Sequence, residues 1–395
     1  MAESIKDKVA IIGMGCCKFG ENWWWNAEDM LVESTKEAFA DAGVEPKDIQ
    51  AAWLGTTGSF SGQLLARPLK LQYIPIVRVE NACATATDAF RNACYAVAAG
   101  VYDMVLAAGV DKLKDSGISG LGGDALLPGG TGTATGTSAP GSFALAGTRY
   151  AHTYGMTFAE LKHMLAQIDV KNHHNGSLNP KAHFQREITV EQAVNAPMIA
   201  WPLGLFDCCG VSDGSAAAII TTPEIAKKLK PKGDYILVSG LAISCGAGQG
   251  QTQNKYDFVH FQENVTAGDW AYREAGITDP FKEIDLAEVH DCFSITETII
   301  YEDMKWAPRG GAKERIYAGA YTLEGELPVN PDGGLKCFGH PIGASGIRMI
   351  YEVWLQMLGR AGKRQLKKAD IGLTHNLGGA PGSFTCAVAI FRKPD

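Results

Sequence analysis

The sequence lacks any pair of cysteines in C-x-x-C spacing, although it contains 10 cysteines in 395 residues. Cys16-Cys17 and Cys208-Cys209 are adjacent pairs, and this spacing suits a zinc site poorly, so we expect no bound metal. Basic residues are not in excess either. The formal net charge of -7 argues against a general binder of nucleic acid or of anionic membranes.

Long apolar runs are also absent. No stretch reaches the roughly 20 apolar residues that cross a bilayer, and the N-terminus does not combine a basic region with an apolar run. We therefore expect a cytoplasmic protein whose thiols stay reduced. The composition, 46% hydrophobic and 20% charged, is typical of a globular protein with enough core for two or three domains.

Predicted strands alternate with predicted helices along the first half of the chain. Apolar stretches at 8–12, 51–54, 76–80 and 104–110 predict strands, with a turn after the first one at Gly13-Met-Gly15. This alternation predicts an α/β fold with a mostly parallel sheet covered by helices. Residues 116–141 are rich in Gly, Thr, Ser and Pro without periodicity, which predicts a long loop.

The pattern of the first half recurs after residue 232. A strand at 235–239 matches the opening strand, 284–289 matches 51–54, and 371–374 matches 104–110. The helix after Gly339-His340-Pro341 repeats the apolar spacing of the helix after Cys83. Two βαβαβ-type halves are therefore predicted. We expect an N-terminal half at 1–115, completed by about 205–228, an inserted loop or substrate domain at 116–204, and a C-terminal half at 232–395.

Cys83 lies in a turn of small residues, Asn81-Ala-Cys-Ala-Thr85, between a predicted strand and a predicted helix. Thr85 and Asp88 have the spacing of a capping box for that helix. Because a helix N-terminus favours thiolate over thiol, we expect the pKa of Cys83 to lie below the value of about 8.5 for a free thiol. A structural role is the alternative, and it suits Cys94, on the inward face of the same helix, better.

Other reactive side chains follow predicted strands or precede a predicted helix. They lie in three segments: Glu288 to Phe293, Gly339 to Pro341 and His375 to Gly379. Since functional residues gather at the carboxyl ends of parallel strands, we expect these segments and Cys83 to supply a nucleophile with its acid and base. Taken singly, each also fits a turn whose histidine only binds the backbone.

Together these segments resemble the thiolase superfamily over nearly the full chain, in its sterol-carrier-type and archaeal-type branch. The matching motifs are Asn81-Ala-Cys-Ala-Thr85, His290-Asp-Cys-Phe293, Gly339-His-Pro-Ile-Gly-Ala-Ser345 and Asn376-Leu-Gly-Gly379. The resemblance implies a thiolase-like fold, with two halves in a layered α/β/α/β/α core. In one respect the chain departs from the common pattern. Asn376 stands where other thiolases carry a second catalytic cysteine.

The resemblance implies cleavage of a 3-oxoacyl-CoA by coenzyme A, which is a co-substrate and not a permanently bound cofactor. Cys83 would be the nucleophile of a ping-pong mechanism, and Cys292 would be the acid that replaces the missing cysteine. His340 would accept the proton of Cys83 and, with His290, hold the thioester oxygen. The backbone N–H groups of Cys83 and Gly378 would hold the second oxyanion.

Substrate, direction and partners stay open in the sequence. Trp201 and Phe206 lie in the region that shapes the acyl pocket in the family, so they favour a bulky or aromatic acyl group, such as that of benzoylsuccinyl-CoA in a degradative reaction, or are ordinary core. Gly246 and Gly248 either line the pantetheine path or form a plain turn. The alternatives are an acetoacetyl-CoA thiolase, a retro-aldolase acting on 3-hydroxyacyl-CoA and a non-catalytic scaffold. The resemblance also implies a homodimer and a small zinc-ribbon and OB-fold partner of the DUF35 type.

Overall fold

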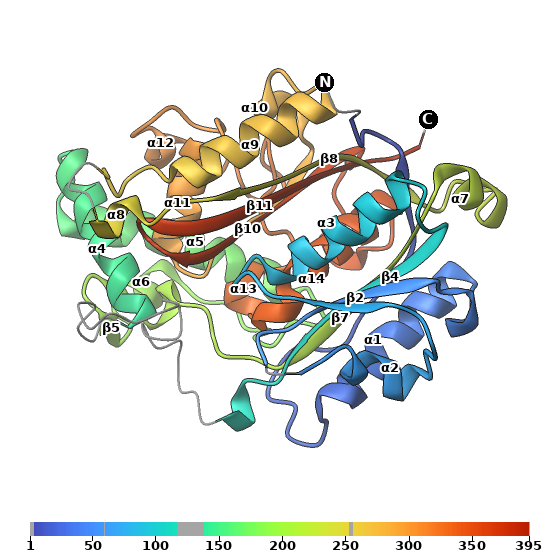
Figure 1. Ribbon diagram of the computed structural model, residues 1–395. Helices are drawn as coiled ribbons and strands as arrows, with labels where there is room; N and C mark the ends of the chain where they lie inside the picture. Colours follow the sequence, from blue (N-terminus) through green and yellow to red (C-terminus); the bar gives the residue numbers. More distant parts are fainter. Residues whose placement is uncertain (1–3, 59, 117–137, 253–255, 395) are drawn as a thin grey trace.

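The computed structural model describes residues 4–58, 60–116, 138–252 and 256–394. Figure 1 shows two halves of a sheet with helices between them and helices on both outer faces, which is the expected α/β/α/β/α layering. Within the described residues, no helix combines the length and the apolarity that crossing a bilayer requires.

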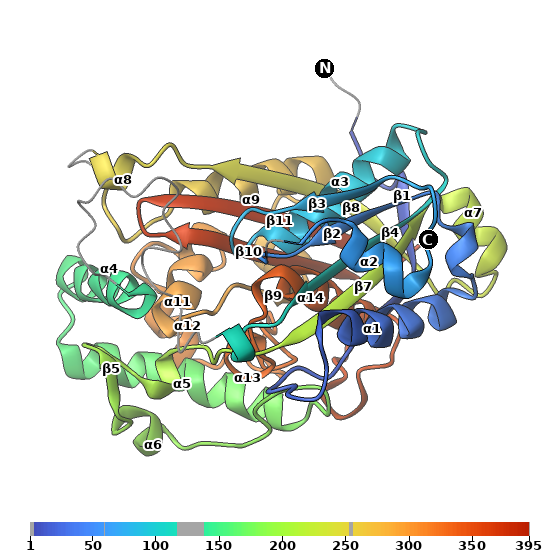
Figure 2. The same cartoon turned by 60° about the horizontal axis from the view of Figure 1, so that its bottom comes forward.

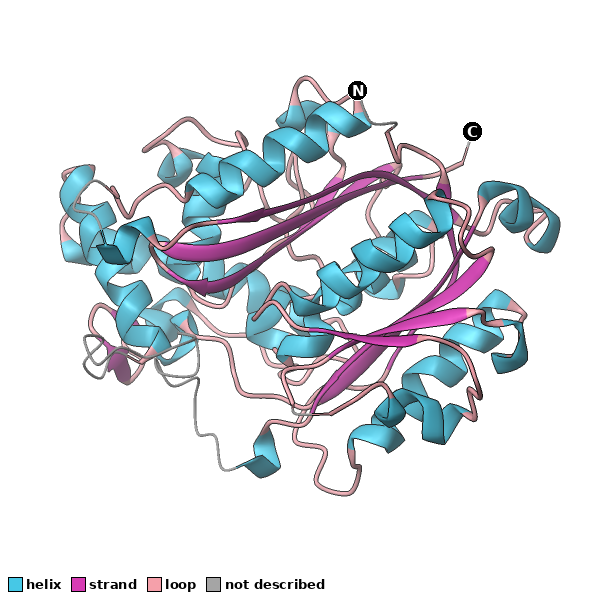
Figure 3. Cartoon of the chain, in the orientation of Figure 1, coloured by secondary structure: helices cyan, strands magenta, loops and turns pink. Residues whose placement is uncertain are grey.

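The strands form one nine-stranded sheet in the order β3-β2-β4-β7-β1-β8-β11-β10-β9, together with a two-stranded sheet of β5 and β6. Figure 3 shows the long strands crossing the molecule as two sets. Their bounds are β1 Val9–Cys16, β2 Ala51–Gly55, β3 Ile76–Val79, β4 Met104–Asp111, β5 Met198–Ala200, β6 Leu203–Gly204, β7 Gly214–Thr221, β8 Ile236–Cys245, β9 Leu286–Glu288, β10 Ile371–Ala380 and β11 Ser383–Arg392.

Helices connect and cover these strands. Their bounds are α1 Ala27–Ala42, α2 Gln63–Leu69, α3 Thr85–Ala98, α4 Ala139–Thr153, α5 Phe158–Ser177, α6 Val190–Val194, α7 Pro223–Leu229, α8 Gln249–Thr252, α9 Gln262–Ala275, α10 Pro280–Glu283, α11 Ser294–Asp303, α12 Ala312–Tyr317, α13 Gly334–Cys337 and α14 Ile342–Met357. The helices expected after Cys83 and after Pro341 are therefore confirmed.

The two helices that follow the Cys83 and His340 motifs occupy the central layer. α3 packs on β4 and β11, α14 packs on β7 and β10, and the two helices touch each other. Figures 1 and 2 show both helices between the two sets of strands, with α1 outside the first set and α9 outside the second. The two large hydrophobic cores of the described residues lie around β1, β4, β7 and α3 and around β10, β11, α5 and α11. The N-terminal ends of α3 and α14 are thus held close together.

The sheet order repeats between the two halves. Counting outward from the β1–β8 pairing, the first half runs β1-β7-β4-β2 and the second runs β8-β11-β10-β9. Three strands of the second half have the counterparts that the sequence pattern had matched to them, namely β1 with β8, β2 with β9 and β4 with β10, and the sheet order adds β7 with β11. The order agrees with two copies of one unit, with β3 added at the edge of the first.

The expectation of a mostly parallel sheet is wrong. Within the described residues, the parallel pairings are β2–β3, β2–β4 and β9–β10. The pairings β1–β7, β1–β8, β4–β7, β8–β11 and β10–β11 are antiparallel. One reason is visible in the chain: only residues 381–382 separate β10 from β11, and so short a link closes a hairpin but cannot make a crossover to a parallel strand.

Two strands run further than their sequence patterns indicated. The turn expected at Gly13-Met-Gly15 lies inside β1, and its glycines serve close packing, since a Cβ on Gly15 would lie 2.0 Å from the Ser34 carbonyl oxygen of α1. The last strand, expected to end at residue 374, continues to Ala380 because β11 pairs with it along its whole length. Most of the loop expected at 116–141 falls on residues 117–137, outside the described residues.

A glycine contact seats α14 on the sheet, and its loss should destabilise the fold. A Cβ on Gly109 would lie 2.1 Å from the Gly343 carbonyl oxygen in the first turn of α14. We expect Gly109→Ala to lower the free energy of unfolding by at least about 1–3 kcal/mol, as overpacked cores do, in denaturant titrations. Gly147→Ala is the matched control. There the nearest atom, Ile295 Cγ1, is 3.8 Å away, so stability should stay equal or rise. An equal loss in both variants would contradict the steric argument.

Candidate active site

The turn that carries Cys83 is fixed by its own hydrogen bonds. Ala82 has a φ of 48°, in the left-handed region, immediately before the cysteine. The Asn81 N–H donates to Thr85 Oγ1 at 2.8 Å, and that hydroxyl donates to the Ala82 carbonyl at 2.5 Å. Cys83 is buried at the start of α3, as expected for a strand, turn and helix.

The capping box expected from Thr85 and Asp88 is wrong. The N-cap of α3 is Ala84, which has no side-chain cap, and Thr85 is already the first helical residue. The Asp88 carboxylate accepts a hydrogen bond from Asn81 Nδ2 at 2.5 Å and is paired with Arg91 at 2.7 Å. The Asp88 side chain therefore binds the turn through Asn81 and does not cap the helix. Cys94, in contrast, is a buried core residue of α3, as predicted.

Three of the predicted site residues converge. Cys83, His290 and His340 each place one sulfur or nitrogen atom within 4.8 Å of the other two. His290 follows β9 and His340 precedes α14, and both side chains are buried. The imidazole rings lie 5.2 Å apart at 78°, edge to face. Segments far apart in the sequence thus place one thiol and two imidazoles around a single point.

The hydrogen bonds of His340 determine which ring nitrogen can act as a base. Its Nδ1 lies 2.8 Å from Ser345 Oγ, and that hydroxyl donates its own hydrogen to the Pro341 carbonyl at 2.9 Å. Ser345 must then accept from Nδ1–H, which leaves the lone pair on Nε2. His340 Nε2 is buried without a hydrogen-bond partner among the described residues. Burial also lowers the pKa of His340 to about 3, so the ring is neutral near pH 7 and suited to accept a proton.

The pKa of the Cys83 thiol differs from the low value expected from the sequence. Burial raises its pKa above the ordinary value, and the hydrogen bond from the Gly379 backbone offsets only part of that rise. The expected low pKa is therefore wrong, because desolvation outweighs the effect of the helix N-terminus at this depth. At rest the sulfur is a thiol. For Cys83 to act as a nucleophile the thiol proton must leave, and the adjacent neutral imidazoles are suitable acceptors.

A second and a third thiol lie beside Cys83. Cys292 Sγ is 3.6 Å from Thr296 Oγ1, and burial, with a further contribution from Cys83, raises its pKa. Cys292 is thus a protonated group close to Cys83, chemically suited to act as an acid. Cys209 donates its backbone N–H to the Cys292 carbonyl at 2.9 Å and contributes to the raised pKa of Cys83. Apart from its adjacent pair with Cys208, no pattern in the sequence points to a role for Cys209.

The strand β10 brings Gly378 against the nucleophile turn. A Cβ on Gly378 would lie 2.8 Å from the Cys83 nitrogen, so the two backbones meet where a larger residue would not fit. Asn376 lies on the same strand and its Oδ1 accepts a hydrogen bond from Thr87 at 2.7 Å. His375 is hydrogen bonded to Asn264 at 3.0 Å, in the second core. Asn376 therefore anchors α3 to β10.

A cavity of about 470 Å³ opens onto His340. Apolar side chains dominate its wall. Besides His340, the lining residues are Leu113, Ala139, Pro140, His173, Phe184, Ile199, Leu205, Phe206, Cys208, Cys209, Gly210, Val211, Phe293 and Lys336. Of the predicted substrate residues, Phe206 lies in this wall. Trp201 is 55% exposed and packs on Phe158, with ring centroids 4.2 Å apart. Gly246 and Gly248 follow β8 and are also outside the wall.

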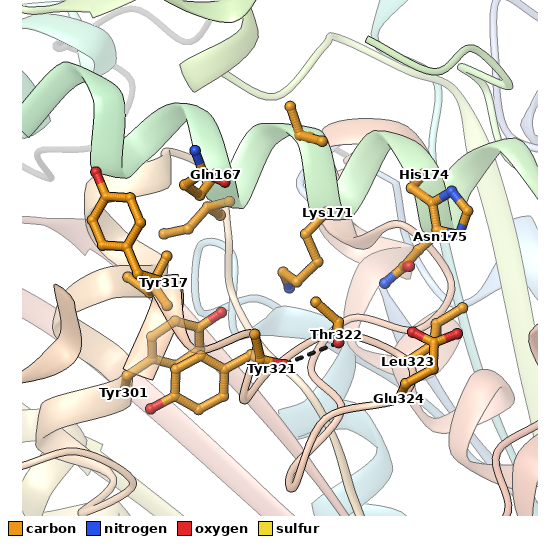
Figure 4. A pocket seen from close by; sticks show the side chains of 14 residues that line it. Gln167, Lys171, His174, Asn175, Tyr301, Tyr317, Tyr321, Thr322, Leu323 and Glu324 are labelled. Carbon is orange, nitrogen blue, oxygen red and sulfur yellow. Dashed lines mark hydrogen bonds between the residues drawn. The ribbon is translucent and has the colours of Figure 1, made fainter. Parts of the chain in front are cut away.

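A second cavity, of about 320 Å³, lies between α5 and the segment 316–324 (Figure 4). Tyr301, Tyr317 and Tyr321 line it, and Lys171 points toward it from α5. The Lys171 ammonium is bound by Glu297 at 2.7 Å and by the Val329 carbonyl at 2.7 Å. None of Cys83, His290 and His340 lines this cavity, whereas His340 lines the first one, so we place the candidate site at the first cavity.

Known proteins resemble this chain along its whole length. Residues 9–224 match the family described as "Thiolase, N-terminal domain", and residues 246–391 match the family described as "Thiolase C-terminal domain-like". An acetyl-CoA acetyltransferase of Methanothermobacter thermautotrophicus is 39% identical over 393 residues, which cover 98% of this chain and 99% of the relative. Sterol carrier protein 2 of Bos taurus is 32% identical over 391 residues, which cover 95% of this chain and 70% of the relative. Among solved structures, an Ltp2-ChsH2(DUF35) aldolase has a TM-score of 0.82 at 27% identity, and the match covers 97% of this chain and 98% of that one.

Alkylation of Cys83 should reveal its raised pKa. Because the thiolate is the reacting species, we expect the rate constant with iodoacetamide to rise about tenfold per pH unit between pH 7 and 9, without the levelling that a free thiol of pKa about 8.5 begins to show. Peptide mass spectrometry would follow Cys83 in a Cys245→Ser background, which removes an exposed thiol. A rate already constant between pH 6 and 8 would indicate a preformed thiolate and contradict the assignment.

Proposed function

Because this chain belongs to the thiolase family and is an acyl-CoA acyltransferase, we propose that it cleaves a 3-oxoacyl-CoA with coenzyme A through an acyl-Cys83 intermediate. The observation that carries the proposal is the convergence of Cys83, His290 and His340 within 4.8 Å, beside an apolar cavity whose wall includes His340. A buried nucleophile with a neutral base beside it is the arrangement that covalent acyl transfer requires.

In the first half-reaction, Cys83 Sγ attacks the 3-oxo carbon while its proton passes to His340 Nε2. The backbone N–H groups of Cys83 and Gly378 hold the resulting oxyanion, and each such donor is worth on the order of 10²–10³ in rate. When the C2–C3 bond breaks, the electron pair moves onto the thioester as an enolate. His340 Nε2–H and His290 face its oxygen, and Cys292 donates a proton to C2 to release a shortened acyl-CoA.

In the second half-reaction, coenzyme A takes the acyl group from Cys83. The Cys292 thiolate removes the proton of the incoming thiol, and the coenzyme A sulfur attacks the acyl carbon. Cys83 leaves as a sulfur anion and regains the proton held by His340. All groups return to their resting protonation states, in which burial keeps both thiols protonated and His340 neutral. The reverse sequence condenses two acyl-CoA molecules.

The cavity supports a bulky acyl group. At about 470 Å³ it falls within the roughly 300–1,000 Å³ of pockets that enclose whole small molecules, and an acetyl group would fill little of it. We therefore propose a degradative reaction on a 3-oxoacyl-CoA with an apolar or aromatic acyl group, of which benzoylsuccinyl-CoA is one example. The second candidate is acetoacetyl-CoA, favoured by the acetyl-CoA acetyltransferases that are 39% and 36% identical to this chain.

Two other functions predict different behaviour. The aldolase among the similar structures favours a retro-aldol cleavage of a 3-hydroxyacyl-CoA, for which no acyl-cysteine forms. A non-catalytic scaffold predicts loss of reactive side chains, whereas Cys83, Cys292 and His340 are all in place. Detection of an acyl-cysteine therefore separates the thiolase from both.

The proposed partners are a second copy of this chain and a small zinc-ribbon and OB-fold protein. Strand β3 supports the homodimer, because among the described strands it pairs with β2 alone and leaves its other edge open, with Val77 exposed. The DUF35 component named in the similar aldolase supports the small partner. Gly246 and Gly248 remain proposed contacts for coenzyme A, beside the β10–β11 hairpin, since the Gly246 N–H donates to the Phe384 carbonyl at 2.7 Å.

Acylation without added coenzyme A tests the mechanism. On mixing with a 3-oxoacyl-CoA, we expect one equivalent of shortened acyl-CoA and an acyl adduct on Cys83, read by peptide mass spectrometry. Cys83→Ser should abolish both, and Cys292→Ser should slow the burst by about 10²–10⁴, the usual contribution of general acid catalysis. Cys94→Ser, on the same helix but in the core, should react like the wild type. Turnover of 3-hydroxyacyl-CoA by Cys83→Ser would instead establish the aldolase.

Narrowing the cavity should change the acyl preference. In Cys208→Phe the added ring occupies the apolar wall, so we expect kcat/KM for a benzoyl-type substrate to fall about 10–200-fold relative to acetoacetyl-CoA, the range that a poor fit costs in hydrophobic pockets. Val101→Phe, an exposed site outside the wall, is the control. The measurement is turnover over a panel of 3-oxoacyl-CoA thioesters, with and without the small partner. An unchanged ratio of the two kcat/KM values would show that this cavity does not bind the acyl group.

A further inference from the structure

The converging atoms around Cys83 also match the donor set of a metal site. A thiol and two imidazoles lie within 4.8 Å of one another, and each comes from a different loop, at positions 83, 290 and 340. Sulfur and imidazole nitrogen are the ligands that zinc and similar thiophilic cations select, whereas magnesium and calcium prefer oxygen. No cysteine spacing along the chain indicates this set, because only folding brings the three residues together.

Two unpartnered nitrogens provide a second, independent observation. His290 Nδ1 and His340 Nε2 are both buried, and neither has a hydrogen-bond partner among the described residues. Both residues are more than nine-tenths buried, at 1% and 2% exposure. A buried polar atom without a partner is rare in folded proteins and points to a ligand, an ion or a water that completes it. The Ser345 bond to His340 Nδ1 leaves Nε2 as the free position of that ring.

We propose that Cys83, His290 and His340 bind a thiophilic divalent cation of the zinc type, which reversibly occupies the resting active site. With Zn–S near about 2.3 Å and Zn–N near about 2.0–2.1 Å, the ligand atoms of a tetrahedral site lie about 3.3–3.6 Å apart, so small side-chain rotations within the observed 4.8 Å spacing suffice. The edge-to-face rings suit such convergence, because stacked rings would direct their nitrogens in parallel. The fourth position is left for water or an external thiol.

Binding exchanges one cation for one proton. The Cys83 S–H bond breaks, the sulfur keeps its electron pair and forms the metal bond, and the proton leaves to solvent without any change of oxidation state. The same sulfur cannot hold a cation and an acyl group together, so the cation is an inhibitor that competes with acylation. This inference goes beyond the proposed function, since it requires only the three side chains and no turnover.

Metal titration of the chelator-treated, full-length protein tests the site. With Zn²⁺ in a calorimeter, we expect one cation per chain at this site. Cys83→Ser, His290→Ala and His340→Ala should each weaken it by at least about 10–100-fold, which is the loss that removal of a mere outer-shell partner causes. Co²⁺ reports the ligands directly, because a thiolate-to-cobalt charge-transfer band should appear in the wild type and vanish in Cys83→Ser.

Matched controls exclude other thiols and histidines. Cys94→Ser changes a core thiol of the same helix, and His174→Ala changes an exposed histidine paired with Glu187, and both should keep the affinity and the band. Circular dichroism verifies that each variant is folded. Should the His290 or His340 variants fail to fold, wild-type protein alkylated at Cys83 replaces them, and it should show no band.

The outcomes distinguish this inference from the proposed function. Absence of the charge-transfer band in the wild type, or an unchanged Zn²⁺ isotherm in Cys83→Ser, would overturn the metal site while leaving acyl transfer intact. A normal band together with no acyl-Cys83 adduct would overturn the thiolase mechanism alone. If both hold, prior acylation by a 3-oxoacyl-CoA should abolish Zn²⁺ uptake, and Zn²⁺ should slow acylation with an effect that excess chelator reverses.

Discussion

Arg348 joins the two segments that carry the histidines of the site. It is fully buried on α14, and its Nη1 donates to Glu288 at the end of β9 at 2.6 Å and to Asp332 at 2.5 Å. His290 lies two residues after Glu288 and His340 lies just before α14. Removing one partner of such a buried pair typically costs about 3–5 kcal/mol, because an uncompensated charge is left in the core. The distance between the two imidazoles therefore depends on this ionic contact.

The same arginine contributes to the electrostatics of the site. Its positive charge, after the larger effect of burial, lowers the pKa of His340 and helps to keep that ring neutral. Burial acts in the opposite sense on the thiols and keeps Cys83 and Cys292 protonated. The resting site is thus uncharged at its reactive atoms, and charge develops only during reaction, in surroundings where fixed donors stabilise it most strongly. The neutral state also leaves nitrogen lone pairs exposed to any cation that enters.

Close backbone contacts bring the nucleophile turn to this point. Gly378 of β10 lies against the Cys83 nitrogen, and Gly343 of α14 lies against Gly109 of β4. Each contact joins the first half of the chain to the second. The repeated sheet order, β1-β7-β4-β2 and β8-β11-β10-β9, places equivalent ends of α3 and α14 side by side, and so the loops before the two helices bring Cys83 and His340 together.

Local patterns in the sequence were sufficient to predict much of this fold. Periodicity placed the strand, turn and helix around Cys83 and the repeat of the two halves, because these depend on spacings within about twenty residues. It did not predict that β7, β1, β8 and β11 run antiparallel to their neighbours, nor that β10 would extend to Ala380, because pairing depends on partners remote in the chain. Thr85 matched a capping box by spacing yet bonds inside the turn.

The sequence by itself indicated the candidate reactive groups, Cys83, Cys292, His290 and His340, and the family whose motifs contain them. Tertiary structure alone decided the protonation states of these groups and which side chains lie beside them. Burial raises the pKa of Cys83 although a helix N-terminus favours thiolate, and desolvation cannot be read from neighbours along the chain. Folding also brought Cys209 beside Cys83 and assembled a thiol and two imidazoles within 4.8 Å, because distance in space is set by how the two halves pack and not by separation in sequence.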